Sequence, residues 1–414
     1  MAIATGLFKS VAYKAESAWG TAPSAGSAQY VRRVASTLKK GKGTFQSQEI
    51  QTDRQHRDYR HGAEIVSGDI SGELSPLTFD AFFAAVLGAS AFSSAATTGA
   101  LTNVTAAAGS PPGTFTRAAG SYLTDGFKVG DIVRWTGWTS GTSAANNARN
   151  YRITGLTALI MTVGTAATGA SGQPEAVVAQ ASGDSVTCTV VGKKVLTPTS
   201  SLADPSFAIE EWHSDVAQSH IYLGCKPTGF QLQADPTGIA RITFPFLGKT
   251  VTTGTSQYYT TPTAVTTSRL LAGVNGKLSI GGTDFATVTG LSLTVAGGHN
   301  AEAVVGSVTT PGIFPGMIDV SGSLSVLFEN ATLRDAFYTE TETSLRFHMT
   351  TTNDVNADFV SFVMPRIKIS GFDPNDRPQA IQHTIPFMAL NNTSGGSGIN
   401  SDAATLIIQD SSAA

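Results

Sequence analysis

Two short segments far apart in the chain carry nearly the same nine residues. Residues 69–77 read DISGELSPL and residues 319–327 read DVSGSLSVL, so six of the nine positions are identical. One match of this length can arise by chance in a chain of 414 residues. If the surroundings repeat as well, the chain must fold as two similar units, which would constrain its architecture more than any other feature.

The segments after the two nonapeptides both have the pattern of a short helix. The first has apolar residues at the spacing of one helical face, at Phe79, Phe82, Phe83 and Val86. Ser75 is suited to cap this helix and Gly88 to end it. In the second, residues 335–338 (DAFY) echo residues 80–83 (DAFF), and Asn330 is the expected cap. The sequence therefore predicts a strand followed by a helix in both places.

Each copy then continues with a strand and a hairpin. Residues 206–212 and 344–350 alternate apolar and polar side chains, as half-buried strands do. Residues 229–248 and 366–389 each read as two strands joined by an Asp-Pro turn. The second strand carries a proline in a similar setting, within Phe244-Pro245-Phe246 and Ile385-Pro386-Phe387. Because proline cannot donate to a ladder, it marks a strand edge or a bulge.

These signals occur in one order, and we interpret the chain as mainly β, with two tandem β-sandwich modules that each have a flanking α-helix. A long stretch separates the first helix from its next strand, whereas only a few residues do so in the second copy. The extra stretch is predicted to form a small all-β domain inserted into the first module. The predicted divisions are an N-terminal arm (1–25), the first module (26–92 and 203–255), the inserted domain (93–202), a linker (256–274), the second module (275–390) and a C-terminal arm (391–414).

Two tryptophans stand out in the predicted inserted domain. Trp135 and Trp138 follow a strand pattern in FKVGDIVRWTGW. Such side chains can stack on a sugar at a binding surface, or they can form the core of a small barrel. Both interpretations stay open at the level of the sequence.

The two predicted arms contain apolar groups that need a partner. Tyr13 and Trp19 lie in a segment of small and polar residues that is not expected to bury them alone, which suggests docking on a neighbouring copy. The tail after Leu390 ends in a short apolar patch at residues 406–408, a candidate strand to lend to another chain by β-augmentation. Disorder at the chain ends is the alternative.

Composition excludes several classes of function. Charged residues make up 14% of the chain, below the roughly 25% usual for soluble proteins, which favours a surface covered by other protein copies. The net charge of −3 provides no basic field for gathering nucleic acid. We find no catalytic motif, no metal-ligand spacing and no cofactor signature, and we predict no enzyme activity, metal, cofactor or small-molecule substrate. No apolar segment is long enough to form a membrane helix. Two cysteines in a long chain indicate a reducing compartment.

One segment, residues 48–62, concentrates charges of both signs. It contains Asp53, Arg54, Arg57, Asp58 and Arg60, interleaved with histidines and a tyrosine. Arginine beside an aromatic ring suits nucleic-acid binding. The mixture of signs instead favours ion pairs with another protein surface, and we predict that these five residues contact another subunit.

Several segments in this order resemble the tail tube (major tail) proteins of long-tailed, non-contractile bacteriophages. The resemblance rests on VAYKAESAWGTAP, DRQHRDYRHG, DISGELSPLTFDAFFAAVLG, FKVGDIVRWTGW with NYRITGLTALIMTV, and FAIEEWHSDVAQSHIYLGC. It implies tail-tube-like β-sandwich modules that assemble into stacked rings around a channel for DNA and the tape measure protein. It carries no catalytic residues.

The same resemblance implies the partners and the location. In relatives with a duplicated module, three chains form a pseudo-hexameric ring, so trimeric rings are expected here rather than hexameric ones. The long loop around residues 44–66 would contact the adjacent ring, and the inserted domain would decorate the outside. Tail initiator and terminator proteins are further expected partners, and a membrane is not. The protein would be part of the virion tail, assembled in the cytoplasm of the bacterial host.

A second hypothesis is a phage or bacterial surface-binding β protein. In that case the inserted domain would bind carbohydrate, and glycan affinity would depend on Trp135 or Trp138.

Overall fold

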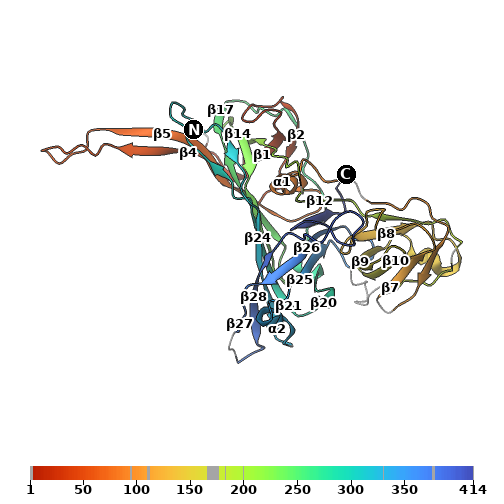
Figure 1. Ribbon diagram of the computed structural model, residues 1–414. Coiled ribbons are helices and arrows are strands. Elements are labelled where there is room, and N and C mark those ends of the chain that lie inside the picture. The colour runs from red at the N-terminus through yellow and green to blue at the C-terminus, as the bar shows by residue number, and fades with distance from the viewer. Residues whose placement is uncertain are drawn as a thin grey trace.

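The computed structural model describes residues 3–413 except 94–95, 110–111, 166–176, 182, 199, 330 and 375–377. Strands dominate it, and the mainly β fold class is confirmed. An extended sheet system contains strands from both halves of the chain, and a separate sheet comes from the stretch between them. Figure 1 shows a central sheet edge-on, a long hairpin projecting to one side and the separate sheet on the other.

The strands before residue 256 form the first part of the sheet system and the separate sheet. The elements of the sheet system are β1 (Lys9–Ala15), β2 (Gly26–Tyr30), β3 (Ala35–Ser36), β4 (Lys39–Gln46), β5 (Tyr59–Glu73), β12 (Lys193–Leu196), β13 (Phe207–His213), β14 (Gln218–Pro227), β15 (Gly229–Ala234), β16 (Arg241–Gly248) and β17 (Thr250–Gly254). Those of the separate sheet are β6 (Val104–Ala107), β7 (Gly113–Arg117), β8 (Ile132–Thr136), β9 (Asn150–Leu156), β10 (Ile160–Thr165) and β11 (Thr187–Val190).

The strands after residue 256 complete the sheet system, except for β22 and β23. They are β18 (Thr261–Thr263), β19 (Gly276–Ile280), β20 (Thr283–Phe285), β21 (Val288–Ala296), β22 (Asn300–Ala301), β23 (Ile313–Phe314), β24 (Asp319–Leu327), β25 (Thr343–Thr350), β26 (Phe359–Ile369), β27 (Asp373–Pro374), β28 (Gln382–Ala389) and β29 (Ile407–Asp410). The helices are α1 (Asp80–Val86), α2 (Thr332–Tyr338) and the short 3₁₀ turns η1 (Gly6–Phe8), η2 (Gly141–Asn146) and η3 (Gly273–Asn275). A pair formed by β22 and β23 stands apart from both sheets.

The helices form where the sequence predicts them, with one difference at the start of α1. Gly88, with a φ of +75°, ends this helix as expected. Ser75 does not cap it, because Leu77 adopts a φ of +63° and delays the helix to Asp80. The Ser75 hydroxyl instead lies 2.6 Å from the Thr78 hydroxyl. The expected cap of α2, Asn330, lies outside the described residues.

Strand pairing follows the same order in the two halves of the sheet system. β1 pairs with β13, β13 with β14 and β16 with β5; β19 pairs with β25, β25 with β26 and β28 with β24. Both β13 and β25 bulge after their first residue, at Phe207 and at Thr343. The two halves nevertheless share one hydrophobic core, which joins Phe82 and Phe244 to Leu324 and Phe362.

The ladders correct the alignment of the two nonapeptides. Pro245 lies opposite Asp69, whereas Pro386 lies opposite Ser323. If the two prolines are equivalent, Asp69 corresponds to Ser323. The nonapeptide alignment pairs Asp69 with Asp319 instead, which is four residues away. The ladders instead match Val66-Ser67-Gly68 with Val320-Ser321-Gly322, since Gly68 faces Phe246 and Gly322 faces Phe387. The two nonapeptides lie in strands that pair in the same way, β5 and β24, but their positions relative to the two prolines differ by four residues.

The stretch between α1 and β13 has its own core. β6 to β11 form one antiparallel sheet in the order β11-β8-β9-β10-β7-β6. Phe115, Trp135, Tyr151 and Met161 pack together within it, separate from the main core. A buried ion pair between Lys194 and Asp131, at 3.0 Å, connects this part to the sheet system.

The C-terminal segment is a strand of its own chain's sheet. β29 pairs with β12 on one side and with β26 on the other. The Gln409 side chain, buried beside it, donates to the carbonyls of Ile132 (2.9 Å) and Val191 (2.8 Å) and accepts from the Ile132 amide (3.0 Å). The apolar patch that we expected to reach another chain is therefore used within this one.

A buried carboxyl pair gives a testable pH dependence. Burial, reinforced by the nearby Asp410 carboxylate, raises the pKa of Asp80 to about 8, and burial raises the pKa of Asp410 to about 6. Both pKa values lie above the value of about 4 that an aspartate has in the unfolded chain. Above pH 4 the folded protein therefore keeps protons on these carboxyls that the unfolded chain has released. The stabilisation is complete below about pH 4 and is lost as the pH rises through about 8.

We therefore expect the free energy of unfolding to fall between pH 5 and pH 8. Asp80→Asn should flatten this dependence and stabilise the protein at pH 8 by on the order of 2 kcal/mol. Urea unfolding at the two pH values measures this, with Asp53→Asn at an exposed position as the matched control. A wild type equally stable at both values would contradict the assignment.

Candidate assembly surfaces

The charged segment lies at the tip of the projecting β4–β5 hairpin (Figure 1). Asp53, Arg54, Arg57, Asp58 and Arg60 are all exposed there. Arg57 pairs with Asp53 at 2.6 Å and Arg60 with Asp58 at 2.9 Å, and the hydrogen bond from Arg60 holds the pKa of Asp58 below its usual value. Arg54 makes no ion pair within the described part of the chain. Exposed ion pairs of this kind add little stability, so the structure gives no internal reason for this cluster.

Apolar side chains share the hairpin with these charges. Phe45, Ile50 and Tyr59 are exposed, and Ile50 is fully so. A strand pair that buries so little of its apolar surface gains little from folding alone. At its base, Gly68 of β5 has a φ of +147°, and a Cβ atom there would lie 2.5 Å from the Thr37 carbonyl oxygen, so a larger residue does not fit. These features favour a hairpin that is covered by another protein chain.

The second half carries a different loop at the same end of the sheet. Residues 297–318 occupy the position between β21 and β24, and their exposed groups include Val305, Val308 and Met317. The Glu64 amide of β5 donates to the Val308 carbonyl at 2.8 Å, so the two loops lie side by side. One end of the molecule therefore presents a charged hairpin beside an apolar loop.

The N-terminal aromatic groups are already covered by their own chain. Tyr13 lies in β1, a strand of the main sheet, and its ring packs 4.7 Å from that of Phe82. Burial, with a smaller effect of Asp80, raises the pKa of Tyr13 to about 12. Trp19 donates to the Gly224 carbonyl at 3.2 Å, and the Lys249 ammonium lies 4.7 Å from its ring centre. The premise that this segment cannot bury its aromatic groups is wrong, because β1 adds to β13.

Trp135 and Trp138 form part of a core, and no binding surface includes them. Both are buried, with ring centroids 5.9 Å apart and Phe115 packed against each. A sugar cannot reach faces that neighbouring side chains cover. The carbohydrate-binding role proposed for these two residues is therefore wrong.

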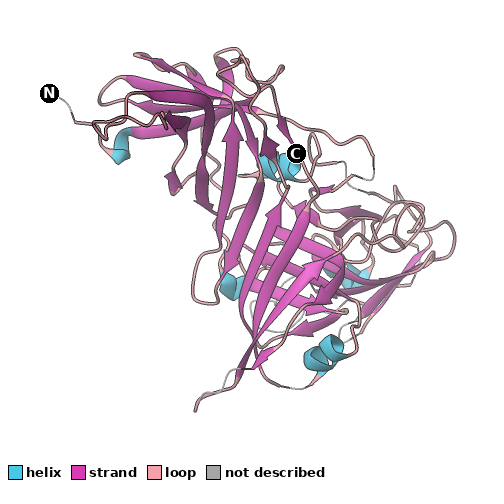
Figure 2. Ribbon diagram, turned by 60° about the vertical axis from the view of Figure 1, so that its left-hand side comes forward, coloured by secondary structure: helices cyan, strands magenta, loops and turns pink. Residues whose placement is uncertain are grey.

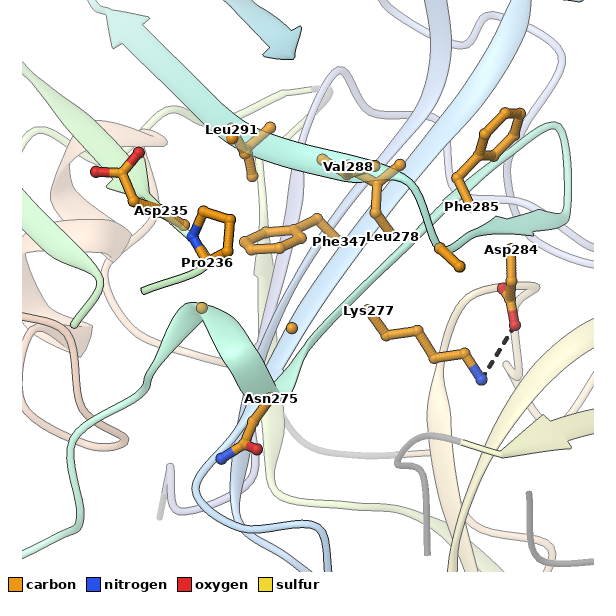
Figure 3. Close-up of a pocket in the computed structure, with 15 residues that line it drawn as sticks. Asp235, Pro236, Asn275, Lys277, Leu278, Asp284, Phe285, Val288, Leu291 and Phe347 are labelled. Carbon is orange, nitrogen blue, oxygen red and sulfur yellow. Dashed lines mark ion pairs between the residues drawn. The ribbon is translucent and has the colours of Figure 1, made fainter. Parts of the chain in front are cut away.

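A pocket of about 290 Å³ lies where β15 ends and β21 begins. Figure 3 shows the side chains that line it. Leu278, Leu291 and Phe347 form its apolar wall, and Lys277 pairs with Asp284 at 3.0 Å on its rim. Although burial opposes ionisation of Asp284, its cationic neighbours Arg152 and Lys277 hold its pKa below the usual value. This carboxylate is neutralised twice and is poorly suited to acid–base chemistry. Within the described residues, no cluster of three or more His, Cys, Asp or Glu side chains could hold a metal ion.

The two halves of the chain meet edge to edge in a ladder that sequence reasoning missed. β15 of the first half pairs with β21 of the second over six residue pairs, from Gly229–Ala296 to Ala234–Leu291. We call this ladder the seam. Gly229 is required there, because a Cβ atom would lie 2.1 Å from the Val295 carbonyl oxygen. The seam makes the sheet continuous from β4 through β5, β16, β15, β21 and β24 to β28, and Figure 2 shows its long strands side by side.

The comparisons identify the family. The family model for phage tail tube proteins matches residues 9–389, nearly the whole chain. The chain therefore belongs to the phage tail tube protein family, a family of structural proteins of the virion tail. No curated protein matches it. No helix in the described residues is long and apolar enough to span a membrane.

Proposed function

We propose that this chain builds the tube of a long-tailed, non-contractile phage by forming stacked rings of three chains. DNA and the tape measure protein would occupy the lumen, and tail initiator and terminator proteins would bind the ends. Assembly would take place in the cytoplasm of the bacterial host. The two strand sets are, in this proposal, two copies of one module, and residues 93–202 decorate the outside.

The observation that carries this proposal is the seam between β15 and β21. The seam joins the two halves of one chain, because an edge strand of the first half pairs with an edge strand of the second. The strands within each half pair in the same order. A contact that joins one half to the next can also join one chain to the next. A closed ring removes all such edges, and cyclic symmetry does so with one kind of contact. Three chains would supply six modules.

One face of the continuous sheet fits the wall of a DNA conduit. Opposite the buried residues of β15, β16, β21 and β24, the other face carries mainly uncharged polar groups: Gln231, Gln233, Thr243, Ser292, Thr294, Ser321, Ser323 and Ser325. Its charged residues in these strands are one cation, Arg241, and one anion, Asp319. In Figure 1 the helices and the separate sheet lie on one side of these strands, and residues of α1 share a core with the buried face. Each phosphate neutralised by a protein cation adds affinity for DNA, so a wall with few cations allows DNA to slide. We propose that this face lines the lumen.

The hairpin would make the contact between rings. Its exposed apolar and charged groups lie at one end of the sheet, beside the apolar loop 297–318. In a stack of rings this end faces the next ring. Asp53, Arg54, Arg57, Asp58 and Arg60 would then be buried against a neighbouring chain.

Electron microscopy of the purified chain tests the proposal. We expect long hollow tubes, with a tail initiator added where nucleation is slow. A variant that lacks residues 47–58 removes the exposed tip and should form single rings without tubes. Virion tails that contain no copy of this chain would contradict the proposal, and tubes from the shortened variant would contradict the role of the hairpin.

A further inference from the structure

The outer edges of the two halves match the seam residue by residue. On one side, the Thr228 amide donates to the Pro245 carbonyl at 2.8 Å, and the Ser370 amide donates to the Pro386 carbonyl at 2.9 Å. Farther along, Gln231 lies opposite Thr243, as position 373 lies opposite Thr384. Gly371-Phe372 therefore occupies in the second half the place of Gly229-Phe230 in the first, and the sequence repeats the two residue types.

The partner strand of the seam also has a counterpart. Val295 lies opposite Val320, and Lys40 lies opposite Val66, its equivalent in β5. Leu291 lies opposite Leu324, and Ser36 lies opposite the equivalent Ile70. Val295 thus corresponds to Lys40 and Leu291 to Ser36, and each of the two pairs is separated by the same number of positions in the sequence. Residues 291–296 of β21 therefore correspond to residues 36–41 of β3 and β4. Leu293 and its counterpart Leu38 are both buried.

Both counterparts are unpaired on their outer side. In the described part of the chain, β27 pairs only with β28, and β3 and β4 pair only with β5. A Cβ atom at Gly371 would meet only the Pro386 ring at 3.0 Å, without the close carbonyl found at Gly229. In the first half, the backbone of β21 lies next to Gly229. Among the described residues, no backbone occupies the corresponding space next to Gly371. Exposed edges of this kind pair readily with another chain.

We propose that residues 371–374 of one chain pair antiparallel with residues 38–41 of the next chain in the ring. The register follows from the seam: Gly371 opposite Gly41, Phe372 opposite Lys40, position 373 opposite Lys39, and position 374 opposite Leu38. This inference rests on the proposed ring and specifies its chain-to-chain contact. The occupant of each edge is a second copy of this chain.

Two further observations agree with this register. It sets an acidic residue type, at 373, against Lys39, which is exposed and makes no ion pair within the described residues. Opposite charges directly across a ladder stabilise the pair. It also sets a proline, at 374, against Leu38, whose carbonyl already accepts a hydrogen bond from the Tyr222 hydroxyl at 2.9 Å. A residue without an N–H does not need that carbonyl.

Engineered cysteines at the opposed positions test the register in assembled tubes. Asp373→Cys combined with Lys39→Cys should form disulfides between chains on mild oxidation, giving covalent species that end at three chains. The off-register pair, Asp373→Cys with Gly41→Cys, should cross-link at least tenfold less. Gln231→Cys with Thr294→Cys is the matched control, because the seam places this pair opposite each other within one chain. The native thiols of Cys188 and Cys225 are buried with raised pKa values and should not compete.

The outcomes separate this inference from the proposed function. Tubes without cross-links at 373 and 39, or with equal cross-linking off register, would overturn the register and leave the tube intact. A native chain that never assembles would overturn the proposed function itself. If the cysteine variant does not assemble, a charge exchange decides: Lys39→Glu should weaken assembly, and adding Asp373→Lys should restore it. Failure of that restoration would also overturn the register.

Discussion

Phe82→Ala is expected to lower the free energy of unfolding by about 3–5 kcal/mol, the range for a buried phenylalanine in a close-packed core. The Phe82 ring has 1% of its surface exposed. Its centroid lies 4.7 Å from that of Tyr13, 5.4 Å from Phe207 and 5.2 Å from Phe246. These residues come from β1, α1, β13 and β16, so the cavity would loosen contacts between four elements. Urea unfolding followed by near-UV circular dichroism measures the change.

The second helix offers a matched control. Phe337 is the counterpart of Phe82 in the DAFY segment, but it is only partly buried, and the next residue, Tyr338, is 67% exposed. Phe337→Ala should therefore cost less than half as much as Phe82→Ala. Equal losses at the two positions would show that the core is not centred on α1.

Truncation before Thr405 is expected to have a larger effect and to leave the chain unable to fold stably. It removes β29 and the residue before it, Leu406; Leu406 and Ile408 of β29 are both fully buried in the main core. Loss of a large buried aliphatic group typically costs 2–5 kcal/mol, and this deletion removes two together with two strand ladders. It also leaves the Ile132 amide without its acceptor on Gln409. Soluble yield and resistance to protease measure the outcome.

A single substitution tests the same contacts of β29 without deleting the strand. Gln409→Ala removes only the side chain that bonds to Ile132 and Val191, and should cost about 1–3 kcal/mol because buried polar groups are left without partners. Gln48→Ala, on the exposed hairpin, should change stability by less than 0.5 kcal/mol. A truncated chain as stable as the full one would show that the tail is an independent arm, as the sequence suggested.

The features predicted correctly from the sequence are local ones. The alternation of apolar residues identified β13 and β25, and the spacing of Phe79, Phe82 and Phe83 identified α1. The half-burial predicted for β13 is wrong, because its five successive residues 207–211 are buried. These patterns arise from the periods of strand and helix, which the sequence displays directly. The structure places the charged residues 48–62 at the exposed tip of a hairpin, as expected because so many charges are rarely buried; their predicted contact with another subunit stays a prediction.

The features that the sequence did not show depend on contacts between distant segments. A one-residue change of register moves every side chain of a strand to the other face, whereas the four-residue shift between the nonapeptides preserves the faces. The apolar pattern alone could not detect it. The docking of Tyr13, the burial of Trp135 and the pairing of β29 with β26 depend in the same way on segments far apart in the sequence.

One repeated residue pair in the sequence could have predicted the seam. Gly-Phe at 229–230 returns as Gly-Phe at 371–372, ahead of an Asp-Pro pair in both places. The Asp-Pro turn predicted in both hairpins forms only at 235–236, because Asp373–Pro374 is the strand β27, which pairs with β28. A glycine at a fixed place in a strand marks a close approach of another backbone. Gly229 has such a neighbour within the chain, and Gly371 is the position at which the next chain is expected.

Rotational symmetry in end-on views of the assembled tube tests the central claim most directly. If three chains supply six similar modules to each ring, averaged electron micrographs will show three-fold symmetry. The strand wall would have an approximate six-fold repeat, and three outer densities from residues 93–202 would surround it. A true six-fold ring with six outer densities would contradict the three-chain ring, and so would a particle without a central channel.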